Sequence, residues 1–289
     1  MNDLTVIDGA EVAELNAFLG TEVSGGKAEP SISKLPILQI NGRSKSKGTR
    51  LPIPEGSFYF RGFGEPAYSE TITFRPLASH VQYLHFTDVK QDNGEDKWTL
   101  VNKSLAVINP NRDEARDIKG GIACGMPSWD ARKEMDYADA KVWRDMQNRV
   151  IRGLASFTGT TEDGEEVVYE NQPCIMFNKA TNYGGFWKDF HSKLPAGSHL
   201  YNYEAEMYLK HNEKGSVSWY TIGWTPDLDN QLPLTQEVKE TMMVFADTLR
   251  AENKEIDEKY FSAIKEGSID TKAMKALGDS LDADLEDVA

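Results

Sequence analysis

The side chains that could do chemistry in this chain are aromatic rings and bases that alternate along short segments. The clearest case is residues 58–61, Phe-Tyr-Phe-Arg, where strand alternation places Tyr59 and Arg61 on one face and both phenylalanines on the other. One of these faces must belong to a core. A flat ring beside a guanidinium can stack on a base and neutralise a phosphate, so the Tyr59/Arg61 face is a candidate contact surface for single-stranded nucleic acid.

A basic segment precedes this strand. Residues 41–50 are polar, contain no acid and are interrupted by Gly and Ser, which predicts a loop that could close over a phosphate backbone. The bases of this segment are Arg43, Lys45, Lys47 and Arg50. Other residues could extend the track along further strands: Arg75, Tyr83, His85, Lys103, Arg149 and Arg152. Core packing is the better interpretation of four more aromatic residues: Trp98, Trp187, Trp219 and Tyr220.

No strong catalytic motif accompanies these residues. The sequence has no P-loop, dinucleotide-binding, H-E-x-x-H or G-x-S-x-G pattern. Glu204 and Glu206 could bind one metal from a strand face, although a solvated strand face is the simpler interpretation. The scattered histidines and the two cysteines, Cys124 and Cys174, lack zinc-site spacing. We therefore expect a protein that is not an enzyme, with no cofactor and no metal.

Composition limits the possible settings of the chain. Its 289 residues include 46 acids and 32 bases, a net charge of -14, which disfavours a simple basic nucleic-acid binder. Binding would therefore need a local basic groove on an acidic body. No run of about 18 apolar residues predicts a membrane span, and the N-terminus lacks secretory features. With only two cysteines, we expect the cytoplasm, that of the host cell if the protein is viral, and no membrane partner.

The order of segments predicts a mainly β protein. We expect an N-terminal helix and flexible linker over 1–34, a β-rich core over 35–232 with an insertion at about 109–147, a helical segment over 233–266, and an acidic, disordered tail over 267–289. The insertion should hold a helix within 128–146, and Thr235 should cap the C-terminal helix. The predicted strands do not alternate regularly with helices, which favours an OB-fold-like β-barrel with helical insertions. The predicted strands are 36–40, 56–61, 70–75, 81–86, 98–101, 105–108, 149–157, 167–171, 174–177, 201–209 and 216–224.

The last eleven residues, 279–289, hold five acids and no base. A detachable acidic tail on a body with aromatic and basic segments could compete with nucleic acid for a basic groove, or could recruit partner proteins. A solvated terminus without a role is the alternative.

Several segments together resemble the single-stranded DNA-binding proteins of tailed phages. They include Leu35-Pro-Ile-Leu-Gln-Ile-Asn41 and Gly120-Gly-Ile-Ala-Cys-Gly125, as well as residues 54–58, 73–76, 82–83, 102–104, 150–153 and the acidic tail. The resemblance implies an OB-fold core and a role in DNA replication or recombination. In that family the tail often ends in an aromatic residue that docks on replication partners, whereas this chain ends Asp287-Val-Ala289.

The leading hypothesis is thus a non-enzymatic, sequence-independent single-stranded DNA-binding protein, in which bases stack on exposed rings and the tail modulates access. Single-stranded DNA is the expected partner, with replication or recombination proteins as further partners of the tail, and a homo-oligomer stays open. The rival hypotheses are a virion structural or assembly protein, a strand-annealing recombinase and a metal-dependent nuclease.

Overall fold

The structure is a computed structural model that describes residues 35–41, 54–61, 63–90, 96–108, 134 and 136–265. The predictions for 1–34 and 267–289 lie outside the described residues, as does the basic group Arg43, Lys45, Lys47 and Arg50. The chain forms two compact units. The first unit comprises the chain up to Ser79, Ile151–Met176 and Gly184–Thr248, and the second comprises His80–Val150, Phe177–Tyr183 and the chain from Leu249.

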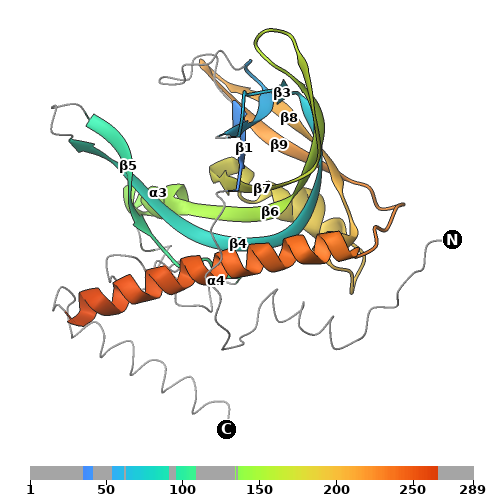
Figure 1. Cartoon of the computed structure of the whole chain (residues 1–289). Coiled ribbons are helices and arrows are strands. Elements are labelled where there is room, and N and C mark those ends of the chain that lie inside the picture. The colour runs from blue at the N-terminus through green and yellow to red at the C-terminus, as the bar shows by residue number, and fades with distance from the viewer. Residues whose placement is uncertain are drawn as a thin grey trace. The chain divides into compact units, whose positions relative to one another are not determined.

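Nine strands and two longer helices make up the described secondary structure (Figure 1). The strands are β1 (Ile37–Asn41), β2 (Ser57–Arg61), β3 (Tyr68–Ser69), β4 (Thr71–Lys90), β5 (Asp96–Lys103), β6 (Gln147–Thr160), β7 (Glu166–Lys179), β8 (Ala205–Lys214) and β9 (Val217–Pro226). The helices are α3 (Tyr137–Met146) and α4 (Gln236–Lys265), and the short helical turns are η1 (Ala180–Asn182), η2 (Phe186–Phe190), η3 (His191–Lys193) and η4 (Leu200–Asn202).

Five strands of the first unit close into a barrel. The sheet order is β3-β2-β1-β7-β6-β4-β8-β9, and an additional pairing of β3 with β6 closes the ring of β1, β2, β3, β6 and β7. The closing register places Tyr68 opposite Thr160. An odd number of strands requires one parallel pair if the others are antiparallel, and β1 runs parallel to β7 at Ile37 and Leu38. The predicted mainly β class, with a barrel, a C-terminal helix and few other helices, is confirmed.

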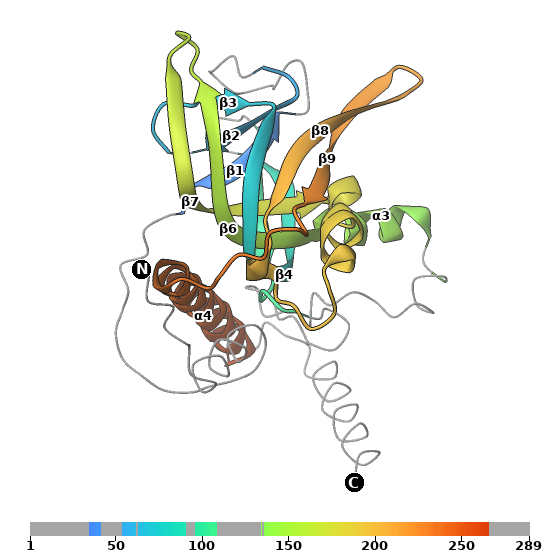
Figure 2. The same ribbon diagram turned by 90° about the vertical axis from the view of Figure 1, so that its right-hand side faces the viewer.

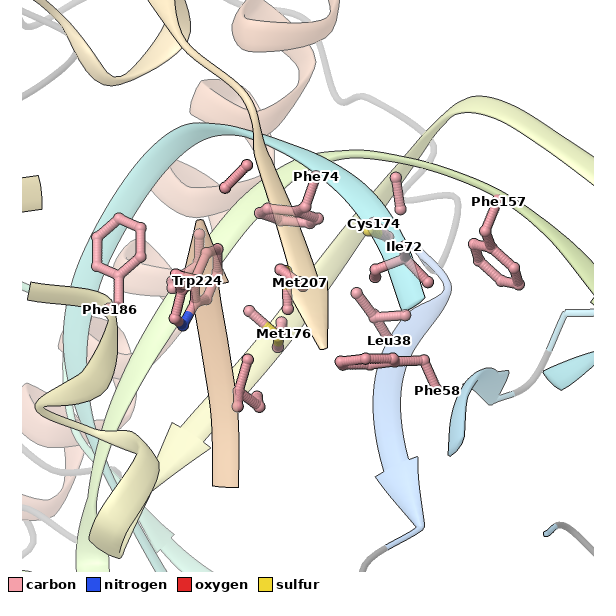
Figure 3. Packing of buried hydrophobic residues seen from close by; sticks show 14 of the residues in the cluster. Leu38, Phe58, Ile72, Phe74, Phe157, Cys174, Met176, Phe186, Met207 and Trp224 are labelled. Atoms are coloured by element: carbon pink, nitrogen blue, oxygen red, sulfur yellow. The ribbon is translucent and has the colours of Figure 1, made fainter. Parts of the chain in front are cut away.

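The barrel interior is filled by alternate residues of its strands. Phe58 and Phe60 of β2 point inward, and so do Cys174 and Met176 of β7. Figure 3 shows Phe58 and Leu38 close together, with Cys174, Met176 and Ile72 in the same cluster. Burying such side chains stabilises the fold by about 1.5–3 kcal/mol each.

A two-residue turn joins the last two strands. Lys214 pairs with Val217, so β8 and β9 form a hairpin through Gly215 and Ser216. Gly215 takes a φ of +63°, a left-handed conformation that glycine adopts without a Cβ clash. Figure 2 shows the two hairpins, β6–β7 and β8–β9.

Helix α4 covers the other face of the central strands in the first unit. Thr235 begins the helix as predicted, because its Oγ1 accepts a hydrogen bond from the Val238 N–H over 3.3 Å. Val238, Met242 and Phe245 then pack against Leu77 of β4 and Leu154 of β6. We call this side of β4 and β6 the covered face; helical spacing in α4 is what allows one stripe of residues to bury it.

The second unit is held together by polar side chains as well as by apolar packing. The Gln82 amide donates to the Ser104 carbonyl over 3.0 Å, and the Ser104 Oγ accepts from the Tyr83 N–H over 2.9 Å. On α4 the Asn253 amide bonds both the N–H and the carbonyl of Ala106, over 2.9 and 3.1 Å. Helix α4 is continuous through Asn253.

In two places, two successive segments that were predicted as separate strands form one long strand. Segments 70–75 and 81–86 are both parts of β4, and segments 167–171 and 174–177 are both parts of β7. Pro76 can lie inside β4 because the φ angle that its ring imposes is compatible with extended backbone. Proline has no backbone N–H, so no donor is left without a partner at this position. In β7, Asn171 absorbs the irregularity with a φ of +47°, and its N–H donates to the Ser156 Oγ over 2.8 Å.

Candidate nucleic-acid interface

The outer surface of β1, β2 and β3 carries the clearest candidate site. Phe58 and Phe60 are 0% and 2% exposed, whereas Tyr59 is half-buried and Arg61 is exposed. The prediction that the Tyr59/Arg61 side of this segment faces outward is confirmed. It follows from the alternation of a strand whose apolar face closes a barrel.

Strand register extends this surface over three strands. Tyr59 lies opposite Gln39 of β1 and opposite Tyr68 of β3. The Tyr59 hydroxyl donates to the Gln39 Oε1 over 2.9 Å, which fixes the ring along the sheet. The Tyr68 hydroxyl donates to the Thr161 carbonyl over 3.0 Å. We call Gln39, Tyr59, Arg61 and Tyr68 the outer row.

The electrostatics of the outer row suit an anion. Burial raises the pKa of Tyr59, and the positive charge of Arg61 opposes that shift, so the guanidinium acts on the phenol at close range. Within the described residues Arg61 has no ion-pair partner, and the outer row contains no acid. A phosphate placed here would meet a positive charge beside two aromatic rings.

The basic segment 42–53, which holds the four bases of the predicted 41–50 loop, connects β1 to β2, and the described residues that flank it lie close together. Its flanking residues Asn41 and Gly56 are joined by a 2.8 Å hydrogen bond from the Gly56 N–H to the Asn41 carbonyl. The Tyr220 ring of β9 packs over Gly56, where a Cβ would lie 3.0 Å from the Tyr220 Cε1. His211 of β8 contacts the same ring, with 5.0 Å between centroids. Tyr220 is half-buried and lies where the basic segment begins and ends.

Arg75 lies on the covered face and not on the surface. Its Nε donates to the Tyr201 carbonyl and its Nη2 to the Pro233 carbonyl, both over 2.7 Å. Burial lowers the pKa of Arg75, and the negative charge of Glu204 opposes that shift. This arginine ties β4 to η4 and to the segment before α4, so it is not placed to contact a phosphate.

Arg152 is buried as well. It is 2% exposed on β6, and alternation places it on the same face as Leu154. The reason is the same for both arginines: the extension of the basic track to β4 and β6 assumed that the second face of these strands is in water, but α4 covers it.

The candidates in the second unit are engaged inside that unit. Tyr83 is 1% exposed, and its hydroxyl accepts a hydrogen bond from the Gln147 amide. Lys103 forms an ion pair with Glu252. The Arg149 guanidinium donates to the Tyr183 carbonyl over 3.2 Å and lies 4.8 Å from the centre of the Tyr183 ring. The side chain of His85 lies outside the described residues.

These contacts make structural roles the simplest account of Tyr83, Lys103 and Arg149. Among the predicted strand residues whose side chains the structure describes, it brings together Tyr59 and Arg61 alone on an outward surface.

Trp187 is an exposed aromatic residue that the sequence analysis assigned to the core. It is 52% exposed on η2, whereas its neighbours Phe186 and Phe190 are fully buried. The signal was present in the sequence, since Phe186 and Phe190 share one side of a helical turn and Trp187 and His191 share another.

Other kinds of site find no support in the described part of the chain. No group of three or more His, Cys, Asp or Glu side chains converges there as a metal site would require. None of the helices described is long and apolar enough to cross a membrane. No known protein family, curated protein or solved structure matches the chain.

Proposed function

We propose that the protein binds single-stranded DNA without sequence specificity and without catalysis, through the outer row. The observation that carries this proposal is the position of the outer row on β2 and β3, next to the point where the basic segment 42–53 joins β1 to β2. Oligonucleotide-binding five-stranded barrels also use one strand face and an adjoining loop, but their strands follow a Greek-key order, whereas neighbouring strands of this ring follow the order of the chain.

The chemistry of the outer row supports this function. Tyr59 and Tyr68 offer flat faces, and stacking contributes about 1–3 kcal/mol per base with any sequence. Arg61 offers a charge for the phosphate that links two stacked bases. The Tyr59–Gln39 hydrogen bond holds one ring in place before DNA arrives, so less side-chain entropy is lost on binding.

The acidic body does not oppose such a site, because local potential decides binding once salt screens charges beyond about 10 Å. The acidic tail adds regulation to the proposal. Residues 279–289 would occupy the basic groove at low salt until DNA displaces them, so deleting them should tighten binding. The resemblance to phage proteins supports a role in DNA replication or recombination.

The first test is a fluorescence-anisotropy titration of labelled oligo-dT of about 30 nucleotides, long enough for one or more barrels. It should be run at low and moderate salt, with duplex DNA of the same length and a uridine oligonucleotide as comparisons. We expect binding that prefers the single strand and weakens with salt, because neutralised phosphates release counterions.

Two variants at one position assign the binding to the outer row. Tyr59→Ala should weaken binding about tenfold through the lost stacking. Tyr59→Phe keeps the ring, loses only the bond to Gln39, and should stay within about threefold of the wild type. Absence of binding at low salt, in the full chain and after removal of 279–289, would overturn the proposal; strong self-association in the same samples would then favour an assembly protein.

A further inference from the structure

The short turn η2 presents an aromatic pair to solvent. Trp187 and His191 stack with 4.0 Å between ring centroids and 15° between ring planes. Trp187 remains 52% exposed, so His191 covers only part of the indole.

Two buried phenylalanines on the opposite side of the turn hold this pair in place. Phe186 and Phe190 stack on each other at 5.4 Å, and Phe186 also meets Trp224 edge-on at 5.2 Å. Figure 3 shows the Phe186 ring beside Trp224 in the core of the first unit. Because residues four apart share a side of the turn, burying Phe186 and Phe190 turns Trp187 and His191 outward. An exposed tryptophan held this way is a prepared stacking surface and not a loose side chain.

The charge around the pair is positive, against the trend of the whole chain. Residues 171–203 contain three lysines and a single acid, Asp189. Asp189 is already matched by Lys210, whose Nζ lies 3.5 Å from its carboxylate. Lys188 and Lys193 are exposed, and neither has an ion-pair partner within the described residues. A flat ring flanked by two available ammonium groups matches a base with phosphates on either side.

We propose that Trp187 and His191, flanked by Lys188 and Lys193, form a second stacking site for a base of bound single-stranded DNA. This inference rests on the proposed function and adds a contact on η2 and η3 to the outer row on β1, β2 and β3. The base extends the Trp187–His191 stack on the solvent side of the indole, and the two lysines neutralise the adjacent phosphates. A strand long enough to reach both sites binds more tightly than one that fills only the outer row.

The test uses the full chain and the same oligo-dT titration with four variants. Trp187→Ala should weaken binding about tenfold, whereas Trp187→Phe, which keeps a ring, should stay within about threefold of the wild type. Lys188→Gln together with Lys193→Gln should reduce the slope of log affinity against log salt by about two. The matched control is Phe261→Ala on α4, which removes a ring of similar exposure, 47%, from an acidic neighbourhood and should leave binding unchanged.

Tryptophan fluorescence supplies a readout of the contact itself. A base stacked on Trp187 should quench emission of the wild type on DNA addition, and Trp187→Phe should lose most of that quenching although the other five of the six tryptophans remain. Circular dichroism of each variant should match the wild type, which separates lost contact from lost fold.

The outcomes separate the two proposals. If wild-type protein binds and Tyr59→Ala weakens binding but Trp187→Ala does not, the second stacking site is wrong and the proposed function stands. If Trp187→Ala and Phe261→Ala weaken binding equally, the site is also wrong. If wild-type protein binds no single strand, both proposals fail together.

Discussion

Arg61 on β2 and Arg75 on β4 come from the same kind of sequence and have opposite surroundings. Each follows a phenylalanine of the same buried core cluster, Phe60 or Phe74, so alternation sends both arginines to the other side of their strands. On β2 that side is in water and Arg61 is exposed. On β4 it is the covered face, where Arg75 bonds two backbone carbonyls. The difference teaches that a basic residue opposite a core residue is a binding candidate only if nothing packs on its face.

The largest effect should come from Arg75→Ala. The substitution leaves the buried carbonyl of Tyr201 and the partly buried carbonyl of Pro233 without their donor, and it opens a cavity, so we expect the free energy of unfolding to fall by about 3 kcal/mol. Urea denaturation followed by tryptophan fluorescence measures the change. A loss below about 0.5 kcal/mol, the range of ordinary surface substitutions, would contradict the structural role of Arg75.

Gly153→Ala tests how closely β6 approaches β4 beside this arginine. A Cβ at Gly153 would lie 2.4 Å from the Arg75 carbonyl oxygen and 2.6 Å from the Phe74 ring. Overpacking of this kind should lower the free energy of unfolding by about 2 kcal/mol. Gly184→Ala is the matched control, because no atom lies within 4 Å of its added Cβ; equal stability changes in both variants would argue against the close approach.

Thr235→Ala tests the start of the helix that covers the face. Removing the hydroxyl that accepts from the Val238 N–H should lower the free energy of unfolding by about 1 kcal/mol. Thr235→Ser keeps the acceptor and should stay near the wild type in the same urea titration. If Ser and Ala are equally destabilising, the cap does not contribute and the methyl group does.

Arg61→Ala should have the smallest effect on stability and a selective effect on binding. We expect the free energy of unfolding to change by less than about 0.5 kcal/mol, since the side chain is exposed. The slope of log affinity against log salt should fall by about one, as for the loss of a single phosphate contact. Anisotropy titrations at several salt concentrations measure the slope; an unchanged slope would remove Arg61 from the DNA-contacting residues.

Much of the fold could be predicted from local patterns. The two-residue period of residues 58–61 assigns their core face, and the helical spacing of Val238, Met242 and Phe245 after Thr235 predicts α4 and its start. These predictions succeed because the period of the buried side chains matches the geometry of the element itself. The two long strands β4 and β7 were split in prediction because Pro76 and Asn171 are typical of turns, although each can be accommodated in extended backbone.

Less of the candidate site could be predicted. The same sequence reasoning that placed Tyr59 on an outward face also selected Arg75, Arg152 and Tyr83, all of which the structure buries. It assigned Trp187 to the core, and the structure exposes it. Each of these differences concerns the face of a strand or helical turn that lies opposite its apolar face. The spacing of the apolar residues predicts the element but says nothing about what packs on that opposite face.

The sequence by itself determined that the chain is mainly β with a C-terminal helix, which face of a segment such as 58–61 is apolar, and that bases gather between β1 and β2 in an acidic chain. These are local properties, set by neighbours within a few residues. Only the tertiary structure decided that Arg75 and Arg152 are buried, and that Trp187 is exposed beside the buried Phe186 and Phe190. A face becomes buried when a segment distant in the chain packs on it, and such a contact leaves no periodic pattern near the residues it covers.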